Sequence, residues 1–196
     1  MMKLLATVVA MTTALAITGC SSSGAKESDM MASNDTNPMV GGAPMYADKN
    51  IIENAVNSKD HTTLVAAVKA AGLVDTLQGE GPFTVFAPTN AAFDKLPDGA
   101  VANLLKPENK AALQKVLTCH VVGTNALSGA IMTMVDDDMG AHPVPTLGGC
   151  TLMATYKGDK IMLEDENGRI STVTIADVKQ SNGVIHVVDT VLLPKQ

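Results

Sequence analysis

The fold of this chain is decided by one stretch near its C-terminus, Ser181-Asn182-Gly183-Val184-Ile185-His186-Val187-Val188-Asp189-Thr190-Val191-Leu192-Leu193-Pro194. Asn-Gly is a turn signal, and we expect Gly183 to adopt a positive φ because glycine has no Cβ to clash in that conformation. The β-branched run from Val184 to Val188 predicts a strand. The stretch therefore predicts a tight turn between two runs.

Upstream of this turn the pattern is that of an antiparallel meander. Strands are expected at Cys119–Val122, Cys150–Tyr156, Lys160–Leu163 and Ser171–Ile175. Turn signals at Gly158-Asp159 and Asn167-Gly168 separate the last three of these runs. We therefore expect two successive antiparallel hairpins.

The first half of the domain is mainly helical. Apolar residues recur at helical spacing in 50–57 and 62–71, and further helices are expected at 100–105 and 107–117. The alternating run Phe83 to Ala87 stops at Pro88 and predicts a strand. Thr89 or Asn90 can cap a short helix after it. Helices followed by a meander predict an α+β fold.

Residues 1–19 have the layout of a secretory signal peptide. Lys3 precedes an uncharged run from Leu4 to Ile17, which is too short to span a bilayer, and polar residues come after Cys20. The ending Ile17-Thr18-Gly19-Cys20 resembles the bacterial lipobox, which implies acylation of Cys20 and cleavage before it. The alternative is an ordinary signal peptide with a chance cysteine. The serine after Cys20 resembles the outer-membrane sorting class, with either face of that membrane left open.

Composition limits what the rest of the chain can be. Residues 20–47 are rich in Ser, Asn, Asp, Gly, Pro and Met, and they predict a flexible tether. Residues 48–196 are long enough for one domain with its own core. The formal charge of −6 and the lack of a Lys/Arg cluster exclude nucleic acid as a partner, because phosphate contacts need a basic face. The expected partners are the membrane, through the lipid anchor, and envelope or extracellular molecules.

Two cysteines remain once Cys20 is lipidated. Cys119 and Cys150 form an even pair in an exported domain, which is read first as a structural disulfide. A redox-active pair and a metal site are the alternatives. The absence of C-x-x-C spacing and of an adjacent Lys or Arg argues against both.

Motifs for catalysis or for a cofactor are absent from the sequence. It contains no G-x-S-x-G, H-E-x-x-H, P-loop or helix-opening G-x-G-x-x-G. His120 and His186 each precede a Val-Val pair and could serve as metal ligand or base if the two rings meet. A half-buried ring held by one hydrogen bond is the more common use of such a histidine. The acidic clusters at 136–138 and 164–166 do not match EF-hand spacing. We expect no enzyme activity, no metal and no cofactor.

Three segments resemble the fasciclin family, in that family's order and spacing. They are Phe83-Thr84-Val85-Phe86-Ala87-Pro88-Thr89-Asn90-Ala91-Ala92-Phe93, Leu117-Thr118-Cys119-His120-Val121-Val122 and the opening stretch 181–194. The resemblance implies a β-wedge of antiparallel strands packed with a layer of several short helices. It further implies no catalysis, no cofactor and a role in cell adhesion or matrix attachment. Its motif residues here are Thr89, His120, Asn182, Gly183 and His186.

Two departures from the family pattern bear on function. Cys119 stands where the family usually has the tyrosine of a Tyr-His pair, which makes more sense if Cys119 is bonded to Cys150. Asp177-Val178 occupies the place of an Asp-Ile type adhesion motif found in animal members. The resemblance therefore makes Asp177, Val178 and His120 candidate binding residues.

These observations predict a non-catalytic, lipid-anchored module of the bacterial cell envelope. It would bind a protein or a polysaccharide through an exposed edge near Asp177-Val178. The alternative is a periplasmic carrier of a small ligand or lipid, for which a large apolar pocket would be necessary.

Overall fold

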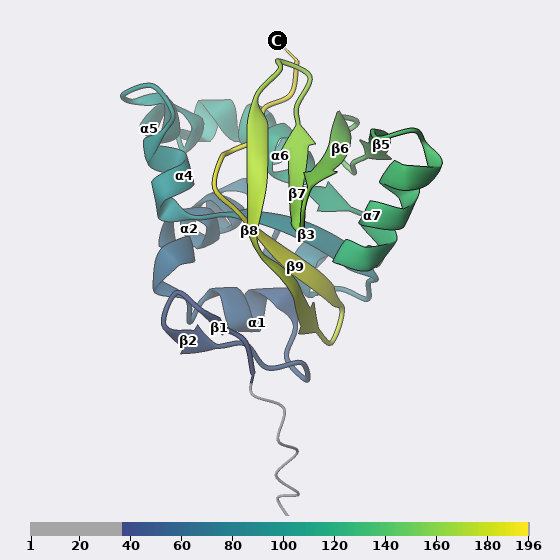
Figure 1. Cartoon of the computed structure of the whole chain (residues 1–196). Coiled ribbons are helices and arrows are strands. Elements are labelled where there is room, and N and C mark those ends of the chain that lie inside the picture. Colours follow the sequence, from purple (N-terminus) through teal and green to yellow (C-terminus); the bar gives the residue numbers. More distant parts are fainter. Residues whose placement is uncertain (1–36, 196) are drawn as a thin grey trace, which may run out of the picture. The chain divides into compact units, whose positions relative to one another are not determined.

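A computed structural model describes residues 37–195 of the chain (Figure 1). The predicted signal peptide, the lipidation site Cys20 and most of the predicted tether lie outside the described residues. Among residues 37–195, no helix combines the length and the apolar character needed to cross a membrane.

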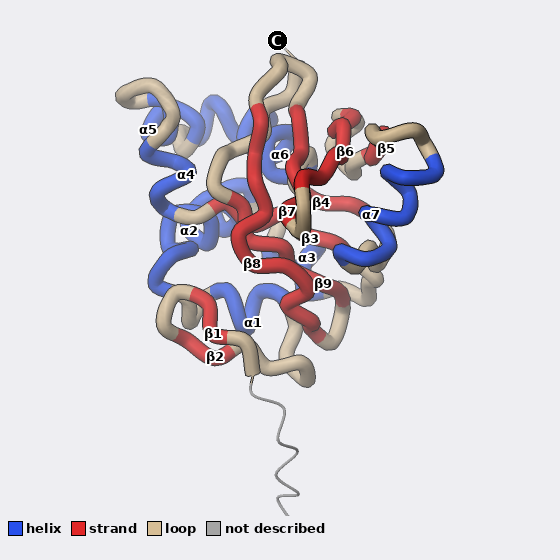
Figure 2. Tube along the Cα trace, in the orientation of Figure 1, coloured by secondary structure: helices blue, strands red, loops and turns tan. Residues whose placement is uncertain are grey.

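A seven-stranded sheet runs through the domain in the order β4-β3-β9-β8-β7-β6-β5 (Figure 2). The strands are β3 (Phe83–Pro88), β4 (Val121–Val122), β5 (His142–Pro145), β6 (Thr151–Lys157), β7 (Lys160–Glu164), β8 (Ile170–Gln180) and β9 (Gly183–Val188). The pairs β6-β7 and β7-β8 are the two hairpins expected from the sequence. One pair is parallel: β3 runs beside β9, with Phe83 opposite Gly183 and Pro88 opposite Val188.

Short helices accompany the sheet. They are α1 (Ile51–Ala55), α2 (Thr62–Ala71), α3 (Val74–Gln78), α4 (Asn90–Asp94), α5 (Ala100–Leu104), α6 (Lys110–Thr118) and α7 (Ser128–Asp137), with 3-10 turns at Lys59–His61 and Pro107–Asn109. Helices α1, α2, α4, α5 and α6 agree with the helical runs read from the sequence. In Figure 1, α7 lies apart from the other helices, beside β5 and β6. The α+β class is confirmed.

Two apolar clusters pack on opposite faces of the central strands. Val85 and Ala87 of β3 face the cluster that contains α1, α2 and α6, whereas Phe86 faces the cluster that contains α7 and β6 to β8. On β9, Ile185 and Val187 belong to the first cluster and Val188 to the second. Strands buried on both faces are typically continuous apolar runs, as Val184–Val188 is apart from His186, and the alternation expected for Phe83–Ala87 does not correspond to one exposed face because Thr84 to Pro88 are all buried.

The structure differs from the sequence expectations in several elements. Residues 37–47, expected to be tether, include the hairpin β1 (Met39–Val40) and β2 (Ala43–Pro44), and Val40 and Met45 are buried in the core. Helices α3 and α7 and strand β5 are additional to the elements expected from the sequence. The strand predicted from Cys119 begins only at Val121, because Cys119 closes helix α6.

Candidate functional site

The turn between β8 and β9 is held by the side chain of Asn182. Its Oδ1 accepts from the backbone N–H of Ile51 at 3.1 Å, at the start of α1. Its Nδ2 donates to the carbonyls of Leu77 at 2.8 Å and Gly79 at 3.0 Å, at the end of α3. One side chain therefore joins two helix termini to the last hairpin.

Gly183 serves a different purpose from the one predicted. Its φ is not among the positive values found in this structure, so the prediction of a positive φ is wrong. A Cβ built on Gly183 would overlap the backbone carbonyl of Phe83 on the neighbouring strand β3. Glycine is required here because two backbones approach closely, not because the turn is left-handed.

Thr89 and Asn90 fix the segment after β3. The Thr89 hydroxyl accepts from the N–H of Ala92 at 3.3 Å and caps α4, as the sequence predicts. The Asn90 side chain accepts from the N–H of Thr63 at 3.0 Å and donates to the carbonyl of Lys59 at 2.9 Å. It therefore also holds the start of α2.

His120 is buried, with 2 % of its surface exposed, and both ring nitrogens are engaged. The backbone N–H of Leu192 donates to Nε2 at 3.0 Å, so the proton is on Nδ1 and is donated to the carbonyl of Val116 at 2.8 Å. Burial lowers the pKa of His120 to about 4, against the partial compensation of the Val116 carbonyl. His120 is therefore a neutral link between α6 and the C-terminal segment, not a contact for a partner.

His186 is engaged in the same way on the other face of β9. Its Nδ1 accepts from the N–H of Asp177 at 3.2 Å, and its Nε2 donates to the carbonyl of Ala126 at 2.8 Å. Burial lowers the pKa of His186 as well, and its ring stacks on Phe86 with centroids 5.7 Å apart. Both ring nitrogens of each histidine are hydrogen-bonded to backbone groups. Neither ring therefore has a free lone pair to bind a metal ion or to act as a base.

The Asp177 carboxylate caps the N-terminus of helix α7. One carboxylate oxygen accepts from the backbone N–H of Ser128 at 2.7 Å and the other from the Ser128 hydroxyl. The Asp177 backbone has a φ of 58°, a conformation that aspartate tolerates better than most residues. The acidic side chain at a helix N-terminus satisfies a donor that the helix itself cannot.

The expected exposed edge at Asp177-Val178 is not formed. Val178 is completely buried in the helical core cluster, and Asp177 is half-buried with both oxygens engaged. The irregular register of β8 against β9 at this point turns the valine inward. The residues that match the adhesion motif therefore stabilise the fold in this chain.

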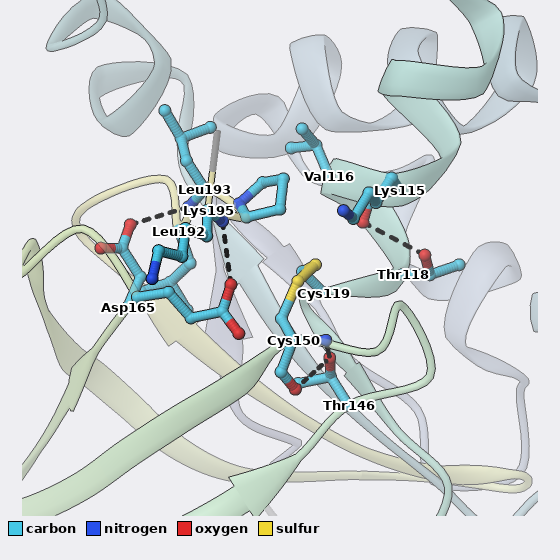
Figure 3. The surroundings of a disulfide bond; sticks show 12 residues. Lys115, Val116, Thr118, Cys119, Thr146, Cys150, Asp165, Leu192, Leu193 and Lys195 are labelled. Atoms are coloured by element: carbon cyan, nitrogen blue, oxygen red, sulfur yellow. Dashed lines mark hydrogen bonds between the residues drawn. A yellow bond between two sulfur atoms is a disulfide. The ribbon is translucent and has the colours of Figure 1, made fainter.

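A disulfide joins Cys119 and Cys150 (Figure 3). The Cα atoms lie 5.4 Å apart, within the range that a disulfide spans, and both residues are buried. The bond connects the end of α6 to the residue before β6. Gly148 lies against Cys119, where a Cβ would meet the Cys119 backbone at 2.6 Å.

Polar clusters that could carry chemistry are scarce in the part of the chain that the structure describes. Within 37–195 no three His, Cys, Asp or Glu side chains are placed to hold a metal ion. His61 is buried against Ser58, whose hydroxyl lies 2.8 Å from Nδ1, and burial lowers the pKa of His61. These observations give no constellation of nucleophile, base and oxyanion donors.

The domain contains an internal apolar cavity and a surface groove, which differ in volume. An apolar cavity of about 60 Å³ lies between the helices and β3, bordered by Leu64, Val68 and Val85. A surface groove of about 440 Å³ lies between α5, α6 and the C-terminal segment 193–195. Sequence reasoning missed this groove, since it is built from four segments that only the fold brings together.

Comparison with known proteins places these features in a family. The fasciclin domain model matches residues 59–194. This chain belongs to the fasciclin family. The hydrogen bonds at Asn182, His120 and His186 lie within the matched residues.

Relatives of this fasciclin domain occur in bacteria and animals. A protein of Synechocystis is 43 % identical over 164 residues, which cover 84 % of each chain. The cell surface glycolipoprotein MPB83 of Mycobacterium bovis is 34 % identical over 168 residues, covering 83 % of this chain and 68 % of the relative. A FAS1 domain pair from the insect cell adhesion molecule fasciclin I has the same fold, with a TM-score of 0.66 at 18 % identity over 74 % of this chain and 51 % of that one.

Proposed function

We propose that this chain is a non-catalytic binding or adhesion module, held to the bacterial cell envelope by lipid on Cys20. The observation that carries the proposal is the use of the motif residues: His120, Asn182 and His186 all bind the chain's own backbone. Because these polar side chains are hydrogen-bonded to the chain's own backbone, they stabilise the fold and are not available to act on a substrate. Binding is then the task of the outer surface.

The relatives and the N-terminal sequence support the envelope as the place of action. The M. bovis relative is described as a cell surface glycolipoprotein, and the insect protein as a cell adhesion molecule. In this chain the lipobox-like Ile17-Thr18-Gly19-Cys20 precedes the domain. A diacylated cysteine gives stable membrane attachment.

Partner binding through strand addition is disfavoured by both edges of the seven-stranded sheet. The edge strand β5 contains Pro143 and Pro145, which have no N–H to donate. The other edge, β4, is only the pair Val121-Val122, and both valines are buried. A protein or polysaccharide partner therefore contacts side chains and loops.

The alternative function, a carrier of a small ligand or lipid, would need a cavity larger than the one inside the domain. The apolar cavity of about 60 Å³ is several times smaller than ligand pockets, which are about 300–1,000 Å³. A lipid enclosed between the helices and the sheet would require the core to open. We therefore keep surface binding as the proposed function.

Retention on isolated envelopes tests the proposal. The chain carrying Cys20→Ser is mixed with envelopes from cells that lack the chain, with heat-unfolded chain as the control. Saturable retention of the folded form is expected. Protease treatment of the envelopes removes it if the partner is a protein, and periodate oxidation removes it if the partner is a polysaccharide. Retention that is equal for folded and unfolded chain, or absent, contradicts the binding module.

A further inference from the structure

The groove between α5, α6 and the C-terminal segment has the features of a ligand site. We call it the C-terminal groove; its volume of about 440 Å³ falls within the range of small-molecule pockets. Its apolar wall is made by Leu96, Ala100, Leu104, Ala112, Val116 and Leu193. In Figure 1, α5, α6, the β7-β8 turn and the C-terminal end lie at the same end of the domain.

The C-terminal side of the groove is fixed by the β7-β8 turn. Asn167 Nδ2 donates to the carbonyls of Leu193 at 3.0 Å and Pro194 at 3.1 Å. Asp165 accepts from the N–H of Leu193 at 2.8 Å, and Glu166 accepts from the N–H of Lys195 at 2.9 Å. Figure 3 shows this segment with Lys115 and Val116 of α6 nearby. The groove is therefore preformed.

Three cationic side chains border the groove: Lys115, Arg169 and Lys195. Two carboxylates, Asp165 and Glu166, lie on the adjoining β7-β8 turn, and Asp165 is buried. Both carboxylates already serve backbone N–H groups. Asp165 accepts from Arg169 N at 3.0 Å as well as from Leu193, and Glu166 accepts from Thr151 N at 3.2 Å as well as from Lys195.

One nitrogen of the Arg169 guanidinium is left without a partner. Its Nη1 is shielded from solvent and has no hydrogen-bond acceptor among residues 37–195. A buried donor without an acceptor is costly and uncommon. A planar guanidinium is best satisfied by a carboxylate, which can accept two parallel hydrogen bonds.

We propose that the C-terminal groove binds an amphiphile made of an unbranched alkyl chain with a carboxylate at its end. The alkyl chain packs on the apolar wall, and the carboxylate accepts from Arg169 with Lys115 and Lys195 close by. The three cationic side chains that border the groove are complementary in charge to a carboxylate. The site goes beyond the proposed envelope module, because it names a ligand class that no motif residue contacts.

Calorimetric titration with dodecanoate, kept below its micelle concentration, tests the site. Dodecan-1-ol, which has the same alkyl chain without the charge, is titrated in parallel. We expect saturable binding of one dodecanoate, at least about tenfold tighter than the alcohol, because hydrogen bonds to charged groups are the strong ones. The full chain with Cys20→Ser is used throughout, so every variant has the same N-terminal segment.

Matched variants separate the groove from other surfaces. Arg169→Gln removes the charge but keeps the backbone bonds to Asp165, and it should weaken dodecanoate about tenfold while leaving dodecan-1-ol unchanged. Ala112→Phe fills the groove from an exposed position and should abolish the binding of both. Lys157→Gln and Ala111→Phe, both exposed and outside the groove, should change neither. Thermal midpoints verify that each variant is folded.

Several outcomes would overturn the site. These are no saturable dodecanoate binding, equal affinity for acid and alcohol, or binding unaffected by Arg169→Gln. A dimer in sedimentation that Ala112→Phe separates would assign the groove to a second copy of the chain instead. None of these measurements uses an envelope, so their failure is distinct from failure of the proposed binding module.

Discussion

Gly183 lies where β9 starts to run beside β3, and the Phe83 carbonyl occupies the place of a side chain. Asn-Gly announces a turn in the sequence, but the requirement for glycine comes from a strand one hundred positions earlier in the chain. Local spacing predicts a turn residue. It cannot predict a parallel neighbour whose backbone fills the Cβ position, so the sequence indicates the right residue for the wrong reason.

Substitution of Gly183 should be costly even for the smallest side chain. Gly183→Ala is expected to lower the free energy of unfolding by about 1–3 kcal/mol, because the clash is with backbone that cannot rotate away. Gly129→Ala is the matched control: it lies in α7 with open space around its Cβ position, and alanine should be neutral or slightly stabilising there. Urea unfolding of both variants measures the difference. Equal stability of the two would refute the close-approach argument.

Acid should destabilise the domain through His120. The pKa of this ring is lowered to about 4 in the folded state, so the unfolded chain binds the proton first as the pH falls below about 6.5. Its stabilising contribution is complete above that pH and is lost progressively toward pH 4. Between pH 7 and about pH 5 we expect a loss of about 2 kcal/mol from this residue. His186 and His61, whose pKa values burial also lowers, act in the same direction.

Urea unfolding across this pH range measures the effect. His120→Gln should show a shallower pH dependence than the parent protein, although it is less stable at every pH. A parent protein equally stable at both pH values would contradict the assignment of a neutral buried ring.

Helix α7 shows why an element can be missing from a sequence reading. Its N-cap, Leu127, has no side-chain hydrogen bond to the helix. The capping group is Asp177, which lies 49 residues after Ser128 in the chain. No start signal is present beside the helix, because the fold supplies it from β8. By contrast, Thr89 caps α4 locally, and it is one of the two cap residues, with Asn90, that the sequence offers.

Removal of the Asp177 carboxylate should loosen α7. Asp177→Ala is expected to cost about 1–2 kcal/mol, since the Ser128 N–H loses its acceptor and alanine adopts the positive φ poorly. Asp177→Asn keeps an acceptor and tolerates that φ, so its cost should be smaller. Hydrogen exchange at the start of α7 follows the effect residue by residue. Faster exchange spread evenly over the whole domain would argue against a local cap.

The disulfide is the covalent counterpart of such long-range links. It closes a loop across a sequence separation of 31 residues that contains α7 and β5. In the chain-entropy account a loop of this size contributes about 3–4 kcal/mol by restricting the unfolded state. Reduction should therefore lower the free energy of unfolding by that order and leave most secondary structure in place.

Thiol titration of the unfolded, non-reduced domain tests the bond directly. We expect no reactive thiol from Cys119 or Cys150, and two after reduction. Cys119→Ser combined with Cys150→Ser should reproduce the stability of the reduced protein. Two thiols per chain before reduction would return both cysteines to the redox or metal alternatives.

At the scale of the whole molecule, the family resemblance predicts more than the local patterns do. The three blocks predict an α+β wedge, and the structure shows why they belong together: β3, the end of α6 and β9 are neighbours through Phe86, His120 and His186. The C-terminal groove is beyond the reach of sequence reasoning, because Lys115 and Arg169 are separated by more than one hairpin in sequence. Their side chains border one groove only after the meander has folded back onto α6.

The anchor is the last test of the whole molecule. In the proposed function, attachment depends on acyl chains at Cys20. Cys20→Ser should move the chain from the membrane fraction to the soluble fraction, whereas Ser22→Ala, a change of similar size two positions later, should leave it membrane-bound. High salt should not release the parent protein, since burial of alkyl chains is not screened by ions. If Cys20→Ser, processed or not at an alternative site, stays in the membrane fraction as tightly as the parent protein through its folded domain, the lipoprotein proposal is wrong.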